Sequence, residues 1–158
     1  MAGISSHDSR VSQRGFSLAV LLVRVMVGGV FIAEGIQKFL FPEALGVGRF
    51  VKIGIPAPEF MAPFVGVVEI GCGMLLLVGL WTSIAAIPLI INMLVAIWTT
   101  KIPILADKGF WAAAHEARTD WSMLLGAAVL FILGSGDWSV DVLLHRRQRE
   151  ATGPEGSS

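Results

Sequence analysis

The chain has 158 residues, of which 54% are hydrophobic and 15% are charged, and its formal net charge is zero. The length suggests one domain, and the composition is too apolar for an ordinary soluble domain and indicates an integral membrane protein. Balanced charge gives no reason to expect nucleic acid as a partner. The one cysteine, Cys72, excludes an intrachain disulfide and a paired-cysteine redox relay.

Residues 1–15 are polar and contain Arg10 and Arg14 directly before an apolar run. A secretory signal peptide begins in the same way. The apolar run here is longer than that of a signal peptide, and no small-residue cleavage motif follows it. We therefore expect an uncleaved first membrane span, over residues 16–41.

This first span contains Arg24, Glu34 and Lys38 within a run long enough to cross a bilayer. At about 100° per residue the three charges lie on one side of the helix. Charged side chains at this depth face protein or water rather than lipid. They either fix the packing of the helix as a folding device or form a functional site, and the spacing alone leaves both interpretations open.

The second predicted span covers residues 61–80 and follows a loop with a short amphipathic piece. Glu69 lies near its midpoint, and Gly66 and Gly73 share its side. Small residues allow helix backbones to approach closely in a membrane, so Glu69 is expected on a packed face. Cys72 is expected to be a small packing residue rather than a reactive thiol.

Residues 83–100 form the third predicted span, which contains Pro88 and Asn92. The proline predicts a kink, and the amide predicts a hydrogen bond to another helix. Residues 101–120 are rich in charge and are expected to be exposed to water. Their scattered carboxylates and single histidine do not make a metal-ligand set, so no metal site is predicted.

The fourth predicted span covers residues 121–133 and ends in a glycine-rich stretch, and the basic tail that follows is expected to be disordered. Tryptophans stand at predicted span ends, as in an aromatic belt, at positions Trp81, Trp98, Trp121 and Trp138. Four spans place both termini on one face. Lysines and arginines outside the spans divide five against five between the faces, so only the clustered arginines after the last span favour cytoplasmic termini.

Because successive spans alternate in direction, the depths of their charges can be compared. Arg24 lies about 6 Å from the midpoint of its span, and Glu69 lies near the midpoint of the next. An ion pair between them is expected, since neutral pairing would explain how both charges survive in hydrocarbon. Glu34, Lys38 and Asp120 are expected to form a second cluster nearer one surface.

Several short motifs resemble, in their order and spacing, the DoxX family of small four-helix membrane proteins. They are Leu22-Val23-Arg24 with Gly28, Gly35-Ile36-Gln37-Lys38, Gly54-Ile55-Pro56, Glu69-Ile70-Gly71-Cys72-Gly73 with Gly79-Leu80, and Gly134-Ser135-Gly136 with Ser139 and Asp141. The resemblance implies an all-α, four-helix transmembrane bundle in a bacterial inner membrane. We expect a polar segment at residues 1–15, the membrane domain at 16–141 and the tail at 142–158.

The family includes a subunit of thiosulfate:quinone oxidoreductase, and other members are linked to membrane oxidoreductase complexes and oxidative stress. The resemblance implies that Arg24, Lys38 and Glu69 form the family's polar core, and we take these three residues as a candidate site for a quinone or a lipid. Asp120 matches, loosely, the carboxylate expected before the last span. With Glu34, these residues are the candidates for catalysis. No haem pair, paired-cysteine motif or nucleotide loop is present, so no resident cofactor is evident.

Two hypotheses about function follow, and membership of a family does not choose between them. In the first, the chain is a membrane subunit of an oxidoreductase system, where Arg24 or Lys38 polarises a quinone carbonyl and Glu69 or Glu34 moves protons. In the second, it is a non-catalytic partner or assembly subunit with structural charges. A carrier has less support, because the chain has no internal repeat and only four spans. Expected partners are the bilayer, proteins of an oxidoreductase complex and further copies of the chain.

The topology can be tested with reporter fusions at Ser158 and within residues 107–115. With four spans and cytoplasmic termini, the fusion at Ser158 reports the cytoplasm and the internal fusion reports the opposite side. Two fusions that report the same side would show that the number of spans is wrong.

Overall fold

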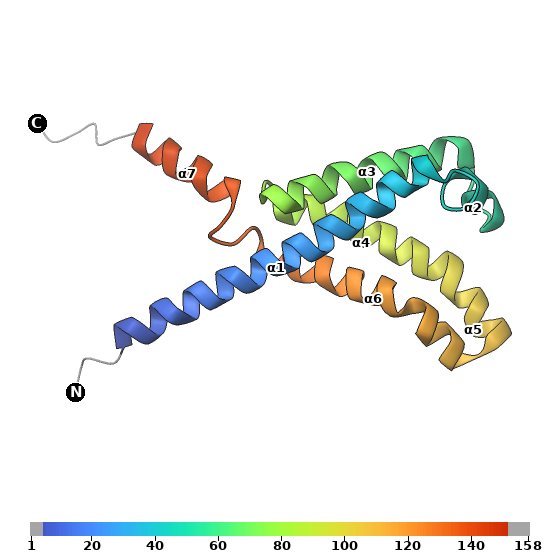
Figure 1. Ribbon diagram of the computed structural model, residues 1–158, viewed down its shortest axis with the longest axis horizontal. Helices are drawn as coiled ribbons and strands as arrows, with labels where there is room; N and C mark the ends of the chain where they lie inside the picture. The colour runs from blue at the N-terminus through green and yellow to red at the C-terminus, as the bar shows by residue number, and fades with distance from the viewer. Residues whose placement is uncertain (1–4, 152–158) are drawn as a thin grey trace, which may run out of the picture.

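The computed structural model describes residues 5–151, and every regular element in this range is helical. Figure 1 shows their arrangement. In chain order the elements are α1 (Ser5–Leu40), α2 (Val47–Lys52), α3 (Pro58–Val78), α4 (Thr82–Ala96), the π-helix η1 (Ile97–Lys101), α5 (Ile102–Lys108), α6 (Phe110–Leu133) and α7 (Val140–Ala151). The predicted all-α fold is confirmed.

Three helical stretches are long and apolar enough to cross a membrane, and they are Gln13–Leu40, Pro58–Val78 and Thr82–Lys108. The third joins α4, η1 and α5 into one stretch. Helix α6 has 24 residues, but charged residues occupy its first half. It packs against α4 and α1 and completes a bundle of roughly four spans, which confirms the predicted multi-pass membrane architecture.

The helix ends differ from the prediction in three places. Residues 101–120, predicted as a water-exposed segment between two spans, are helical, and only Gly109, with φ +82°, interrupts the chain between α5 and α6. Many of the intervening residues are alanine or charged residues that favour helix. Helix α1 already begins at Ser5, inside the polar segment. Helix α7 occupies residues expected to be disordered from 142 onward, while residues 152–158 lie outside the described part.

Helices α1 and α3 cross at glycines, and the distances there leave no room for side chains. A Cβ atom added to Gly28 would lie 2.8 Å from the Gly73 carbonyl oxygen, and one added to Gly35 would lie 2.7 Å from the Gly66 carbonyl oxygen. Such close approach maximises van der Waals contact between helices in a membrane. The predicted packed face around Gly66 and Gly73 is therefore confirmed.

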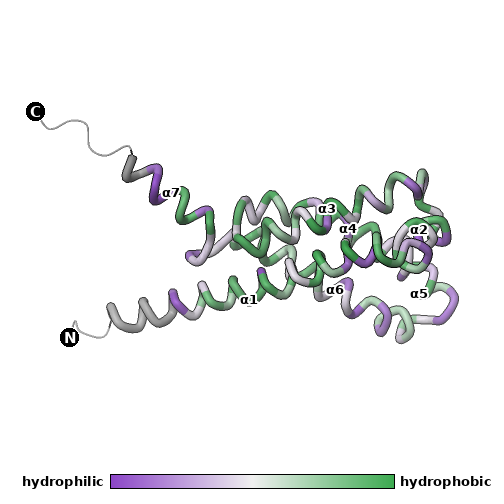
Figure 2. Tube along the Cα trace, turned by 45° about the horizontal axis from the view of Figure 1, so that its top comes forward, coloured by the Kyte–Doolittle hydropathy of each residue, from purple (hydrophilic) through white to green (hydrophobic). Residues whose placement is uncertain are grey.

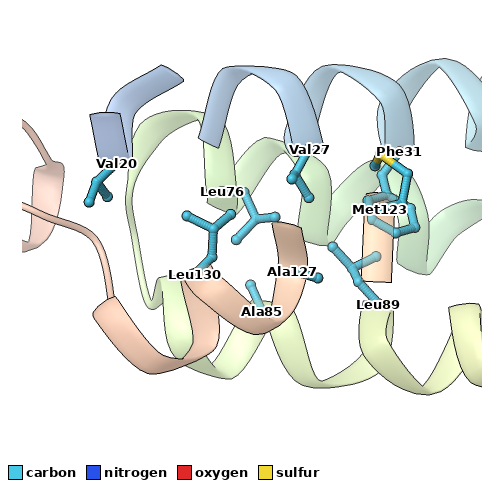
Figure 3. Packing of buried hydrophobic residues seen from close by; sticks show 9 residues of the cluster. All are labelled: Val20, Val27, Phe31, Leu76, Ala85, Leu89, Met123, Ala127 and Leu130. Carbon is cyan, nitrogen blue, oxygen red and sulfur yellow. The ribbon is translucent and has the colours of Figure 1, made fainter. Parts of the chain in front are cut away.

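The four long helices enclose an apolar core, shown in Figure 3. Its fully buried members are Val20, Val27, Phe31, Leu76, Ala85, Leu89, Met123, Ala127 and Leu130. Cys72 is partly buried and packs against this cluster, in agreement with its predicted role as a packing residue.

The two ends of the bundle are different. Helix α2 and the turn between α5 and α6 lie at one end, and the start of α1 and the end of α7 lie at the other (Figure 1). Figure 2 shows apolar residues along the middle of the bundle, with polar residues gathered towards both ends. In the following sections the first end is called the α2/α5 end and the second the terminal end.

The glycine crossing predicts a contrast between two neighbouring positions on α3. Gly73→Leu should lower the free energy of unfolding by about 1–3 kcal/mol, because the side chain would meet Ile32 and the backbone of α1. Gly71→Leu is the matched control, since a Cβ there has no other atom within 4 Å. Denaturant unfolding in detergent micelles measures both, and equal losses would contradict the close crossing.

Candidate functional site

A cavity of about 550 Å³ lies at the α2/α5 end, between α1, α3, α4, η1 and α6, with α2 beside it. Small-molecule sites usually have volumes of about 300–1,000 Å³ and are mostly apolar with a few polar groups. This cavity has the same character. Its charged or amide side chains are Glu34, Lys38, Arg49, Glu69, Asn92, Lys101, Glu116 and Asp120.

The deepest polar group of the cavity is the Glu69 carboxylate, which is 2% exposed. Lys38 Nζ donates to its Oε2 at 2.6 Å, and Asn92 Nδ2 donates to its Oε1 at 2.6 Å. The cluster joins three helices: Lys38 lies in the last turn of α1, Glu69 in α3 and Asn92 in α4. The predicted inter-helix role of Asn92 is confirmed. Each carboxylate oxygen has a donor, as a buried charge requires.

A second ion pair lines the cavity nearer its opening. Lys101 Nζ lies 3.0 Å from Asp120 Oδ2, with the two side chains 13% and 22% exposed. Sequence reasoning included Asp120 but missed Lys101, which was assigned to an exposed loop. Lys101 is the last residue of the π-helix η1, and single π-turns inside α-helices are frequent at functional sites. If the third predicted span had been continued as a helix past Thr100, Lys101 could have been identified as a residue of this site.

Glu34, Arg49 and Glu116 also line the cavity. Glu34 and Glu116 are exposed and Arg49 is half-buried. None of the three has an ion pair within the described part of the chain. Arg49 and Glu116 were missed by sequence reasoning, because α2 and the first half of α6 were placed outside the bundle.

Arg24 lies elsewhere, near the terminal end, and it is 1% exposed. Its Nε donates to the Leu76 carbonyl at 2.8 Å and its Nη2 to the Leu77 carbonyl at 2.8 Å. Its Nη1 donates to the carbonyls of Ser135 at 2.9 Å and Trp138 at 2.7 Å. The guanidinium therefore ties α1 to the last turn of α3 and to the loop after α6.

The expected ion pair between Arg24 and Glu69 is wrong, and the helix register explains why. Gly28 lies against Gly73, so the antiparallel crossing places Arg24 beside Leu77, whose carbonyl it binds. Glu69 lies beside Gly35 instead. The two charges are separated by about eight residues along the helices, or about 12 Å at 1.5 Å per residue.

The surroundings of Arg24 explain the small residues at the terminal end. The last carbonyls of α3 carry partial negative charge and lack partners within the helix, so they suit a cation. Gly79, with φ +70°, leaves room for the guanidinium, since a Cβ there would overlap it. Asp141 holds the same turn: its carboxylate accepts from the Trp81 N–H at 3.1 Å, and its own N–H donates to the Gly79 carbonyl at 3.2 Å.

This geometry defines a multi-pass helical membrane protein with a partly polar cavity at one end of its bundle. The DoxX family model matches residues 19–102. A Mycobacterium tuberculosis protein, described as an uncharacterized membrane protein, is 52% identical over 135 residues, which cover 82% of this chain and 83% of the relative. The Bacillus subtilis protein named "Putative oxidoreductase CatD" is 28% identical over 138 residues, which cover 86% of this chain and 94% of that protein.

No solved structure matches the chain. The family match covers more than half of the chain, and the chain belongs to the DoxX family. The resemblance of the sequence motifs is therefore confirmed.

Four of the five candidate residues line the cavity, and they are Glu34, Lys38, Glu69 and Asp120. Arg24 is not among the lining residues and binds backbone carbonyls instead. The structure thus places Glu69, which was predicted to pair with Arg24, in one cavity with the predicted cluster of Glu34, Lys38 and Asp120. Their chemical roles, and that of Arg24, stay predictions.

The pairing can be tested with a double-mutant cycle. Lys38→Met and Glu69→Leu should each destabilise the protein by about 3–5 kcal/mol, because each leaves the other charge without its partner. The double variant should recover much of this loss. Unfolding in detergent measures the cycle.

Arg24→Leu combined with Glu69→Leu is the matched control for that cycle. These two residues lie about 12 Å apart, so their effects should add. Recovery in this control, or additive losses in the Lys38 and Glu69 variants, would contradict the observed pairing.

Proposed function

We propose that this protein is a membrane subunit of an oxidoreductase system and binds a molecule of the quinone class in the cavity at the α2/α5 end. The observation that carries the proposal is the cluster of Lys38, Glu69 and Asn92 in the wall of a mostly apolar cavity of about 550 Å³. A quinone needs such a setting, because it has an apolar ring and tail and two polar oxygens.

The hydrogen-bonding capacity of the cluster supports this ligand class. An ammonium group has three donors, and Lys38 uses one on Glu69 at 2.6 Å and one, at 3.5 Å, on the Glu34 carbonyl. At least one donor is left for a ligand carbonyl. The Asn92 side chain donates to Glu69 through its nitrogen, which leaves its Oδ1 as an acceptor for a ligand hydroxyl.

Exposed apolar residues on the side of the cavity support entry of the ligand from the bilayer. Phe64, Ile91 and Val95 line the cavity and are 51%, 55% and 44% exposed. In a membrane these side chains face lipid. A lipid-soluble ligand can therefore reach the cavity between helices without crossing the aqueous phase.

The proposed reaction reduces the quinone to a quinol with two electrons and two protons. The electrons come from a partner protein that carries a redox centre, which is oxidised in turn. The protons come from water and pass through Lys38 and Glu69, whose paired charges suit proton transfer. The name of the Bacillus subtilis relative contains the word oxidoreductase, which supports an association with such a system.

In this proposal Arg24 is a positioning residue. Its four hydrogen bonds go to backbone carbonyls, so it holds the helices that carry the cavity. The same observation favours the second candidate function, a non-catalytic membrane partner or assembly subunit whose buried charges are all structural.

We also propose the bacterial inner membrane as the location, with cytoplasmic termini. Lys101 forms an ion pair within the bundle, so in a count of loop cations it has less weight than the clustered arginines Arg146 and Arg147. Fewer free cations at the α2/α5 end support cytoplasmic termini.

Filling the cavity should abolish quinone binding. Val68 is half-buried and lines the cavity, whereas its neighbour Val67 is 62% exposed and faces away. Val68→Trp should raise the Kd for a decyl-benzoquinone by about tenfold or more, a loss of at least about 1.4 kcal/mol. Val67→Trp should bind like the natural protein. Isothermal titration in detergent measures both.

Equal binding by both tryptophan variants would contradict the proposed site. The second candidate function predicts something different. If the charges are only structural, the stable Lys38→Met and Glu69→Leu double variant still assembles with its partner complex and supports that complex's activity.

A further inference from the structure

We infer that water and protons reach the Lys38–Glu69 pair from one membrane face only, the face at the α2/α5 end and opposite both termini. The inference concerns the same cavity as the proposed function. It rests on that function only where it names protons as the species carried.

Polar side chains form a graded path from the α2/α5 end to Glu69. Glu116 of α6 is exposed at the opening of the cavity. Asp120, one helical turn further along α6, is 22% exposed and pairs with Lys101. Glu69 at the deepest point is 2% exposed. All these groups line one cavity, so water that enters at Glu116 can reach Glu69 through the same space.

No comparable path exists towards the terminal end within the described residues. Phe31 and Met123 line the cavity and also belong to the buried core, so they form its floor. In Figure 3 these two residues lie at one end of the core, which continues through Val27 and Leu76 as far as Val20. These side chains are at most 5% exposed. They separate Glu69 from Arg24 by about 12 Å of apolar packing.

Arg24 lies on α1 between Val20 and Val27, beside the terminal part of this core. All its bonds go to carbonyls of α3 and of the loop after α6, and the Gly79 turn is packed directly against it. Four of the five N–H donors of this buried arginine are bonded to carbonyls, and apolar core side chains lie between it and Glu69. A separate pocket lined by Gln13, Phe16, Gly136 and Asp137 lies at the terminal end, but the apolar core separates it from Glu69, whereas the cavity at the α2/α5 end reaches Glu69 directly.

Cysteine labelling in sealed membrane vesicles of known orientation tests the inference on the full chain. Val68→Cys is made in a Cys72→Ala background and treated with a membrane-impermeant maleimide on each face. Lys108→Cys marks the α2/α5 face and Arg147→Cys the terminal face, since both residues are exposed. Val67→Cys, on the lipid-facing side, is the matched control.

Val68→Cys should react from the Lys108 face about tenfold or more faster than from the Arg147 face, because the thiolate that attacks the maleimide forms only where water reaches the thiol. Val67→Cys should react from neither face. Reaction of Val68→Cys from the Arg147 face, from both faces equally or from neither would overturn the inference. If this variant does not fold, Thr100→Cys at the opening of the cavity replaces it with the same expected result. Labelling needs no quinone, so loss of quinone binding with one-sided labelling would reject the proposed function and leave this inference standing.

Discussion

Gly28 and Gly35 of α1 lie against the backbone carbonyls of Gly73 and Gly66 of α3, and this crossing determines which polar groups can meet. Side chains at these positions would push the helices apart and change their register. With the observed register, Lys38 reaches Glu69 and Arg24 reaches the last turn of α3. A shift by one helical turn, about 5.4 Å, would break both contacts.

The bundle satisfies its buried charges in two different ways. Arg24 has no carboxylate within ion-pair distance in the described residues and is stabilised by four carbonyl oxygens. Those carbonyls lie at a helix end and in a loop, where backbone acceptors lack full pairing within a helix, so the arginine satisfies them as well as itself. Glu69 has an ion pair and an amide donor. The first solution uses four of the five guanidinium donors on backbone carbonyls, whereas the second leaves donors and acceptors available at a cavity.

Much of the fold could be predicted from sequence, because the apolar runs and their small residues report helix length and packed faces directly. The inward direction of Glu69 and the inter-helix bond of Asn92 followed from the same reasoning. The partners of Arg24 could not be predicted, since they are backbone carbonyls, which every residue has. The Arg24–Glu69 error came from comparing distances to span midpoints, which ignores how two helices are shifted against each other. Lys101 was missed because a π-turn, invisible in composition, directs it inward.

The motifs that identify the family serve two separate purposes, and this separation bears on what membership means. Gly79, Ser135 and Asp141 gather around Arg24 and its turn, so they identify the fold. Lys38 and Glu69 belong to the same motifs but face the cavity. A relative that keeps the first set and lacks the second would share the bundle without the polar site. Family membership therefore establishes the architecture, and the chemistry must be argued from the pair at the cavity wall.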